Sequence, residues 1–174
     1  IGQGGGLRNL SGTVTIESTT FAGNEADSGG GIYAEDTTTL LNSTLHINKA
    51  FAGGALYRFS ASPVTAKNTI FALSLEPGTI TPQLNCDGSH PLLSDGNNLA
   101  SDNSCNLNLA SDLPATDPLL GPIASNGGPT QTHALLPGSP AIDAGDPGIL
   151  SDPNMFDQRG WPYVRVMDGD GAGG

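Results

Sequence analysis

Positive charge is the scarcest property of this sequence. Only 6 of its 174 residues are lysine or arginine, against 17 aspartates and glutamates, and the formal net charge is −11. The few cations are scattered singly, whereas surfaces that bind a nucleic-acid duplex or anionic lipids cluster them. We therefore expect neither nucleic acid nor a membrane surface as a partner.

Long apolar runs are also missing. The sequence has no stretch of about 18 apolar residues, so we expect no membrane-spanning helix. Charged residues make up only 13 %, whereas 25 glycines and 13 prolines are present. These two residues are the least compatible with helix interiors. Since 36 % of the residues are hydrophobic, the composition indicates a folded chain that is poor in helix.

Cysteine occurs only twice, as Cys86 and Cys105, in a polar stretch. Neither lies in a CxxC pair and no histidine flanks them at ligand spacing, so we expect no zinc site. Two free buried thiols fit such a stretch poorly. We predict a Cys86–Cys105 disulfide, which indicates an oxidising, extracytoplasmic setting and would contribute roughly 3 kcal/mol by closing its loop.

What the sequence does have is a glycine-rich repeat. Gly-Gly followed by a bulky apolar residue occurs at residues 4–7, 29–32 and 53–56, with starts 25 and 24 residues apart. A β-prone run and a third β-prone element follow each time. Such a period indicates one coil of a solenoid per repeat. We predict an all-β, right-handed parallel β-helix over residues 1–110, with three clear coils and a distorted fourth.

Within this repeat, certain residues recur at equivalent places and are predicted to have structural roles. Turn positions are expected at Gly29, Gly30, Gly53 and Gly54. Asn24 and Asn48 fall at the same place in successive coils. Stacked strands lie roughly 4.8 Å apart, so the two amides could form a ladder. Two ordinary turn asparagines explain the pattern equally well.

The pattern changes from about residue 111, since nine of the 13 prolines lie beyond it. Proline removes a backbone donor and restricts the preceding residue. We expect residues 111–174 to form an irregular Pro- and Gly-rich segment that covers the solenoid laterally. Its one helical signal is at 139–145, where Ser139 precedes Pro140 and Gly145 ends the run.

Four motifs in this segment carry a family resemblance. They are DPLLGP at 117–122, NGGPTQTHAL at 126–135, PGSPAIDAG at 137–145 and DQRGWP at 157–162. Together they closely resemble the C-terminal part of the "choice-of-anchor Q" group of secreted or surface-attached bacterial proteins. The upstream coils resemble that group and the repeats of polymorphic outer-membrane adhesins. The resemblance implies a right-handed parallel β-helix located extracellularly or at the bacterial cell surface.

The DQRGWP motif contains the residues expected to dock the tail. Asp157 and Arg159 are predicted to form a structural ion pair. Trp161, the only tryptophan, is predicted to be an apolar peg that fixes the tail to the solenoid. A lone exposed tryptophan could instead stack on a sugar ring.

The sequence contains no clear group of catalytic residues. Asp27, Glu35 and Asp36 fall near coil turns without a neighbouring cation in the sequence, and the three histidines lie far apart. We expect no cofactor, metal or catalytic residue, and a non-enzymatic structural or adhesive module whose ligand is a surface glycan or protein. The alternative is a carbohydrate-binding or polysaccharide-degrading β-helix. A degrading enzyme would need paired carboxylates or a base beside a cation.

Self-association is a further hypothesis from the sequence. The first and last coils of a β-helix expose unpaired strand edges unless capping elements cover them. Because we find neither a capping helix before the first glycine cue nor a short final strand like that of the resembled proteins, we expect coil ends that could pair with another copy. Head-to-tail contact between coil ends would build a filament.

Overall fold

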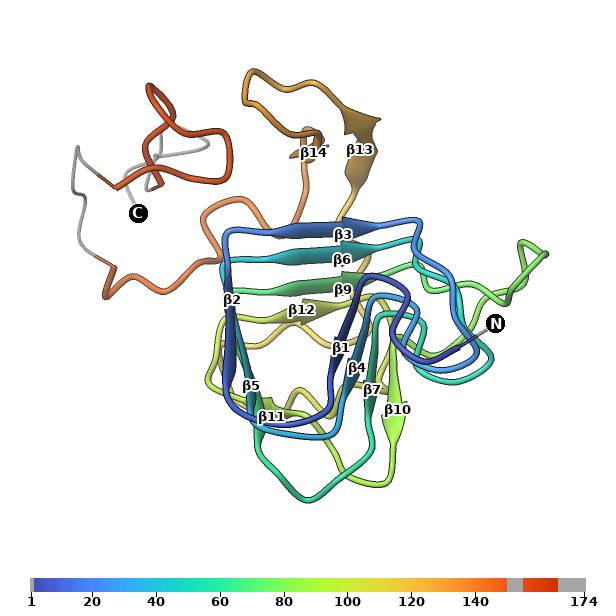
Figure 1. Ribbon diagram of the computed structural model, residues 1–174. Helices are drawn as coiled ribbons and strands as arrows, with labels where there is room; N and C mark the ends of the chain where they lie inside the picture. The colour runs from blue at the N-terminus through green and yellow to red at the C-terminus, as the bar shows by residue number, and fades with distance from the viewer. Residues whose placement is uncertain (1, 150–154, 166–174) are drawn as a thin grey trace.

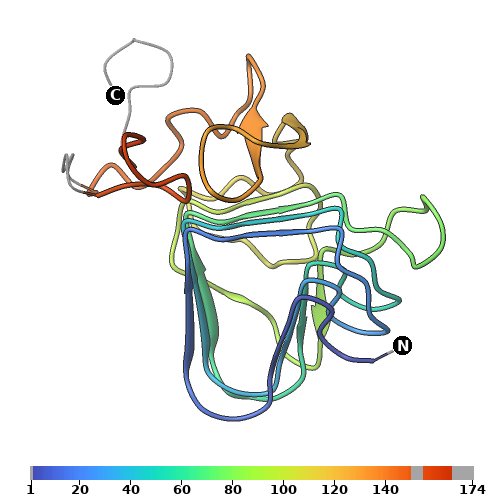
Figure 2. The same ribbon diagram turned by 45° about the horizontal axis from the view of Figure 1, so that its top comes forward.

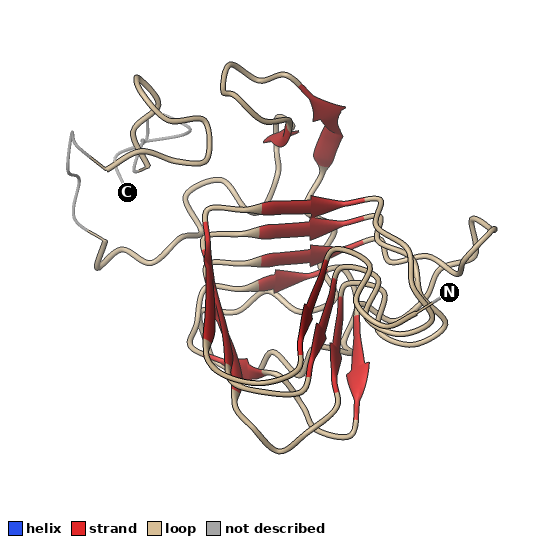
Figure 3. Ribbon diagram, in the orientation of Figure 1, coloured by secondary structure: helices blue, strands red, loops and turns tan. Residues whose placement is uncertain are grey.

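The chain is built from short strands joined by turns. The computed structural model describes residues 2–149 and 155–165, and these contain no helix (Figures 1 and 3). The described residues therefore include no helix that is long and apolar enough to cross a membrane. The strands are β1 (Leu7–Asn9), β2 (Val14–Glu17), β3 (Thr20–Ala22), β4 (Ile32–Ala34), β5 (Thr38–Leu41), β6 (Thr44–His46), β7 (Leu56–Arg58), β8 (Val64–Lys67), β9 (Ile70–Ala72), β10 (Cys86–Gly88), β11 (Leu93–Ser94), β12 (Leu99–Ala100), β13 (Leu120–Ala124) and β14 (Thr132–Leu135).

Every third strand belongs to the same sheet. The orders are β1-β4-β7-β10, β11-β8-β5-β2 and β12-β9-β6-β3, all parallel, so each run of three strands is one coil (Figure 1). Leu7 pairs with Ile32, and Ile32 with Leu56, which is the offset that the glycine cues predicted. The predicted parallel β-helix is therefore confirmed, including its shorter-stranded fourth coil.

Apolar side chains from the three sheets fill the interior of the coils. Alternate residues of each strand point inward, as the alternation of a half-buried strand requires. In the second coil these include Ile32, Leu40 and Leu45, all fully buried. Leu56 and Phe71 lie directly beside Ile32 and Leu45 in the third coil. The core is thus a stack of in-register apolar layers.

Close backbone contact between coils explains the glycine cue. A Cβ atom on Gly30 would lie 2.4 Å from the Lys49 carbonyl oxygen and 2.7 Å from that of Gly54. Gly29 and Gly53 have φ of +64° and +58°, a left-handed conformation that glycine adopts without strain. The predicted turn positions therefore require glycine for steric reasons.

The asparagine ladder proposed from the sequence does form. Asn48 Oδ1 accepts from both the backbone N–H and Nδ2 of Asn24, at 3.1 and 2.9 Å, and its Nδ2 donates to the Phe21 carbonyl at 2.9 Å. Asn48 is fully buried, so these bonds satisfy its amide within the turn. A second asparagine pair that we had not predicted lies at another corner of the coil, after β5 and β8, where Asn68 Nδ2 donates to Asn42 Oδ1 at 3.1 Å.

Residues 101–116 form a cap, which covers the end of the solenoid at the fourth coil. Leu113 pairs with Leu99, and Ala100 N–H donates to the Leu113 carbonyl. Cys105 and Leu107 join the hydrophobic core, and Cys105 is bonded to Cys86 (S–S 1.96 Å), which confirms the predicted disulfide.

Cap side chains also protect strand edges at this end. Ser104 Oγ accepts from Cys86 N–H, and Asp87 Oδ1 accepts from the next edge N–H, that of Gly88. Buried Asp112 accepts from the N–H groups of Asn98 and Leu109. Residues 101–116 therefore cap the fourth-coil end of the stack, where the sequence had suggested only that a final strand was lacking.

The described residues beyond 116 lie along one side of the solenoid (Figure 2). They contain the antiparallel hairpin β13–β14 and contact the sheet that contains β3 and β6. Lys67 Nζ lies 2.5 Å from Asp146 Oδ2, and Asn97 Nδ2 donates to the Ala144 carbonyl. The helical signal at 139–145 was wrong: Ser139 Oγ accepts from Ala141 N–H and donates to the Pro118 carbonyl, but only hydrogen-bonded turns follow.

Candidate functional site

A lateral cluster on the outer face of the β1-β4-β7-β10 sheet brings a cation to a carboxylate. Arg8 and Tyr33 are register partners on neighbouring strands, and Arg8 Nη2 lies 3.6 Å from Glu35 Oε1. The rings of Tyr33 and Tyr57 stack with centroids 5.3 Å apart, and Phe59 packs against Tyr33 at 6.1 Å. The sequence alone had shown no cation near Glu35, because Arg8 comes from the preceding coil.

This cluster has the wrong properties for proton transfer. Tyr33 is only 1 % exposed, so a substrate cannot reach its ring. Burial, followed by the Glu35 charge, raises the pKa of Tyr33, which keeps the hydroxyl protonated rather than ready to act as a base. The ion pair and stacked rings hold adjacent coils together.

The other candidate carboxylates do not complete a catalytic pair. Asp36 Oδ2 accepts from Gly12 N–H and Oδ1 from Thr37 N–H, both at 2.7 Å. These backbone bonds lower the pKa of Asp36. Asp27 precedes β4 in sequence, whereas Glu35 and Asp36 follow it, so a different turn holds it. Through its bond to Gly12 N–H, Asp36 links the turn after β4 in the second coil to the first coil.

Two of the histidines that are far apart in sequence meet in the fold. His46 on β6 and His133 on β14 have Nδ1 and Nε2 3.3 Å apart, and His133 Nδ1 lies 2.7 Å from the Gly121 carbonyl oxygen. A carbonyl can only accept, so His133 Nδ1 carries the proton and its Nε2 accepts from His46. The pair fastens the tail hairpin to the solenoid.

His46 makes this contact sensitive to pH. Burial, and secondarily the nearby His133, lower the pKa of His46 to about 4, although Asp117 opposes the shift. An unfolded histidine takes up its proton near pH 6.5, so between these values only the unfolded chain binds it. We expect the free energy of unfolding to be about 2–3 kcal/mol lower at pH 4.5 than at pH 7 from this residue alone.

Urea unfolding between these pH values would measure the loss. A His46→Leu variant should show a flatter dependence on pH than the native protein. Asp36 and Asp146, whose pKa values are lowered by hydrogen bonds, add their loss only at lower pH. Equal slopes in the native and His46→Leu proteins would contradict the assignment.

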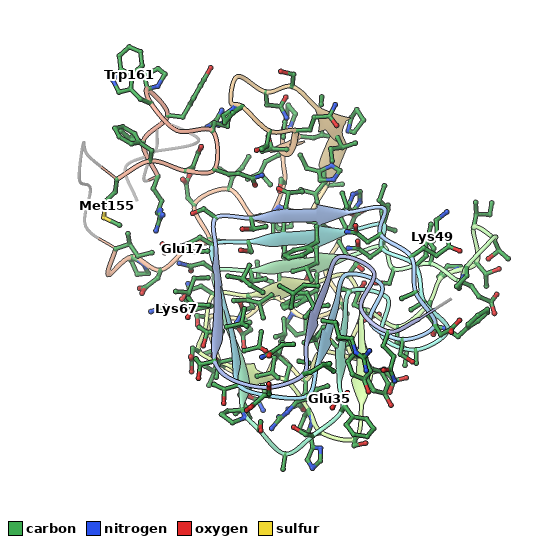
Figure 4. The ribbon with its side chains drawn as sticks, in the orientation of Figure 1. Glu17, Glu35, Lys49, Lys67, Met155 and Trp161 are labelled. Atoms are coloured by element: carbon green, nitrogen blue, oxygen red, sulfur yellow. A yellow bond between two sulfur atoms is a disulfide. The ribbon has the colours of Figure 1, made fainter. Side chains whose placement is uncertain are left out.

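Trp161 occupies a position opposite to the one that we predicted. It is 80 % exposed and projects from the outer end of the tail loop, away from the solenoid (Figure 4). The prediction of an apolar peg is therefore wrong. Such exposure is unusual for the largest apolar side chain, and it leaves the indole free for a ligand.

The loop that presents Trp161 is firmly braced. Arg159 donates from Nε and Nη2 to the Asp157 carboxylate, with the shortest contact at 2.6 Å, so the predicted ion pair is present. The guanidinium also stacks 4.0 Å from the Tyr163 ring centroid. A Cβ atom on Gly127 would meet the Tyr163 hydroxyl at 2.0 Å, so the NGG turn packs directly on this loop.

Contacts to the solenoid fix the same loop from below. Gln158 Oε1 accepts from Thr20 Oγ1 at 2.7 Å, and Arg165 Nη1 lies 2.6 Å from Glu17 Oε1. Trp161 is thus presented on a preorganised support, which reduces the ordering cost of binding.

Metal ligation has no geometric support in this part of the chain. Among residues 2–149 and 155–165, no three His, Cys, Asp or Glu side chains are grouped so that they could hold an ion.

Comparison of the chain with protein-family models, curated proteins and solved structures finds no match.

Proposed function

We propose that this chain is a non-enzymatic, extracellular adhesive module of a bacterial surface or secreted protein, in which Trp161 contacts a surface glycan. The β-helix serves as a rigid support. The observation that carries the proposal is an 80 % exposed indole on a loop braced by an ion pair, a stacked guanidinium and a close glycine contact. An exposed aromatic ring with a polar edge suits the apolar face of a sugar.

The candidate catalytic groups are buried or already hydrogen-bonded within the protein, which supports a non-enzymatic role. Tyr33 is buried and protonated, Asp36 is held by two backbone N–H groups, and Asp102 accepts from Asn85 N–H and Ser104. A glycosidase needs two carboxyl groups that face one sugar. Asp36 and Asp102 instead hold a turn and the cap together.

Two observations support an extracellular location. The Cys86–Cys105 disulfide is buried in the core, and structural disulfides persist mainly in oxidising compartments. The four tail motifs resemble those of the choice-of-anchor Q group, whose members are secreted or surface-attached. Because residues 101–116 cap the fourth-coil end, a module that does not polymerise through that end fits better than a filament subunit.

Intrinsic fluorescence tests the glycan contact directly, because Trp161 is the only tryptophan. Titration with a panel of neutral and acidic bacterial-surface and host glycans should shift or quench the emission for at least one of them. Because Trp161→Ala removes the fluorophore, its affinity is measured by calorimetry, and it should be lower for that glycan by about tenfold or more, as loss of a stacking aromatic anchor does.

A matched substitution controls for general loss of exposed aromatic surface. Phe51 is 56 % exposed on the solenoid, so Phe51→Ala should leave glycan affinity unchanged. If no glycan in the panel alters the fluorescence, or if the two variants weaken binding equally, the proposal is wrong.

A further inference from the structure

A cavity of about 570 Å³ opens beside β10, at the capped end of the solenoid. It lies between the turn that follows β10 and the cap segment at 102–104, and shares no residue with the Trp161 loop. Its volume is within the range of small-ligand sites. Leu56 and Leu92 contribute apolar surface, and Arg58, Asp87, Ser89 and His90 contribute polar groups.

Arg58 brings a buried positive charge to this cavity. It is 5 % exposed and belongs to no ion pair with a carboxylate of the described residues. Its Nε, Nη1 and Nη2 donate to the carbonyls of Ser62, Pro91 and Ala61. A guanidinium has five N–H donors, so two remain beyond these three bonds. Burial lowers the pKa of Arg58.

His90 supplies an independent indication of a missing partner. Its Nδ1 is buried, and no group of the described residues bonds to it. A buried polar atom without a hydrogen bond costs about 1–3 kcal/mol, so native structures rarely retain one without a reason. Because this Nδ1 has no exposed surface, the ring would have to turn toward the cavity, where a ligand hydroxyl could then bond to Nδ1 and to Arg58.

Charge restricts which ligand fits. The Arg58 guanidinium disfavours a cation, whereas the carboxylate of exposed Asp87 and the net charge of −11 disfavour an anion. A neutral sugar has hydroxyl groups that both accept from Arg58 or His90 and donate to Asp87. The apolar floor suits the less polar face of a sugar ring.

We infer that the cavity beside β10 binds one neutral sugar unit through Arg58, Asp87 and His90. The site goes beyond the proposed glycan contact at Trp161, and either site can fail without the other.

Calorimetric titration of the whole chain with glucose, galactose, mannose, N-acetylglucosamine and their common disaccharides tests this inference. At least one should bind. Ser89 is exposed at the cavity, so Ser89→Trp should block the site without touching the core and abolish or weaken binding at least tenfold. His90→Phe keeps the ring volume but removes both nitrogens, and should weaken binding several-fold.

Trp161→Ala separates the two sites, because it should leave the affinity of this sugar unchanged. Three results would overturn the cavity site: no neutral sugar binds, Ser89→Trp binds it like the native protein, or Trp161→Ala alone abolishes binding. The third result would leave the proposed Trp161 contact intact. Tighter binding of glucuronate than of glucose would also overturn the inference, because it would show a site for anions.

Discussion

Replacement of Cys86 and Cys105 together by alanine is expected to lower the free energy of unfolding by about 3–5 kcal/mol. The disulfide closes a loop with a sequence separation of 19, and the chain-entropy model assigns roughly 3 kcal/mol to such a loop. Both sulfurs also belong to the hydrophobic core, so their removal leaves a void beside Leu56 and Leu92. Denaturant unfolding of the two proteins measures the difference.

A control variant separates the bond from the rest of the cap. Ser104→Ala removes the hydroxyl that accepts from Cys86 N–H but retains the disulfide, and should cost only about 1 kcal/mol. Reduction of the native protein should reproduce most of the loss in the double alanine variant. If the double alanine variant lost less than about 1 kcal/mol, the noncovalent contacts of residues 101–116 would be sufficient to hold the cap in place.

Gly30→Ala is the second substitution with a large expected effect. The new Cβ would lie 2.4 Å from the Lys49 carbonyl oxygen and 2.7 Å from the Gly54 carbonyl oxygen. Both atoms are backbone, so no rotamer change relieves the clash and adjacent coils must separate. We expect a loss of about 3 kcal/mol or more, in the range that marks strain and core disruption. Thermal and denaturant unfolding would measure it.

Gly145→Ala is the matched control. It lies in the tail, where an added Cβ meets no atom within 4 Å, and its φ is not in the left-handed region. Alanine there should be neutral or stabilise by up to about 1 kcal/mol, because it restricts the unfolded chain. Similar losses at the two positions would contradict the steric account of the glycine repeat.

The coil architecture could be predicted because a solenoid repeats its contacts at a constant offset. The glycine cues placed Ile32 beside Leu56, and the same offset placed Asn24 beside Asn48. It would also have placed Arg8 beside Tyr33, and hence near Glu35, if applied to charged residues. The second asparagine pair, Asn42 with Asn68, recurs at a similar offset and was overlooked.

The tail offered no such offset. His46 and His133 are 87 positions apart, and nothing periodic relates the segments that carry them. Trp161 was misplaced because apolar character alone favoured burial, whereas polar contacts and glycine packing hold its loop. The turn at 139–145 has helix-capping residues, and Ala141 N–H does bond to Ser139 Oγ, but the backbone hydrogen bonds that follow close only single turns.

The cap was missed for a related reason. Asp112 and Asp102 satisfy backbone N–H groups at the end of the stack, a role that any polar loop residue could have. The two cysteines were the one feature of this segment that indicated an ordered structure.

The central claim, a module that binds glycan without changing it, is tested most directly by recovering the ligand after binding. The glycan that alters Trp161 fluorescence is incubated with the protein at saturating concentration and analysed by mass spectrometry and for new reducing ends. We predict an unchanged mass and no new ends while binding persists. Shortened chains or unsaturated products, absent from a Trp161→Ala sample, would contradict the claim.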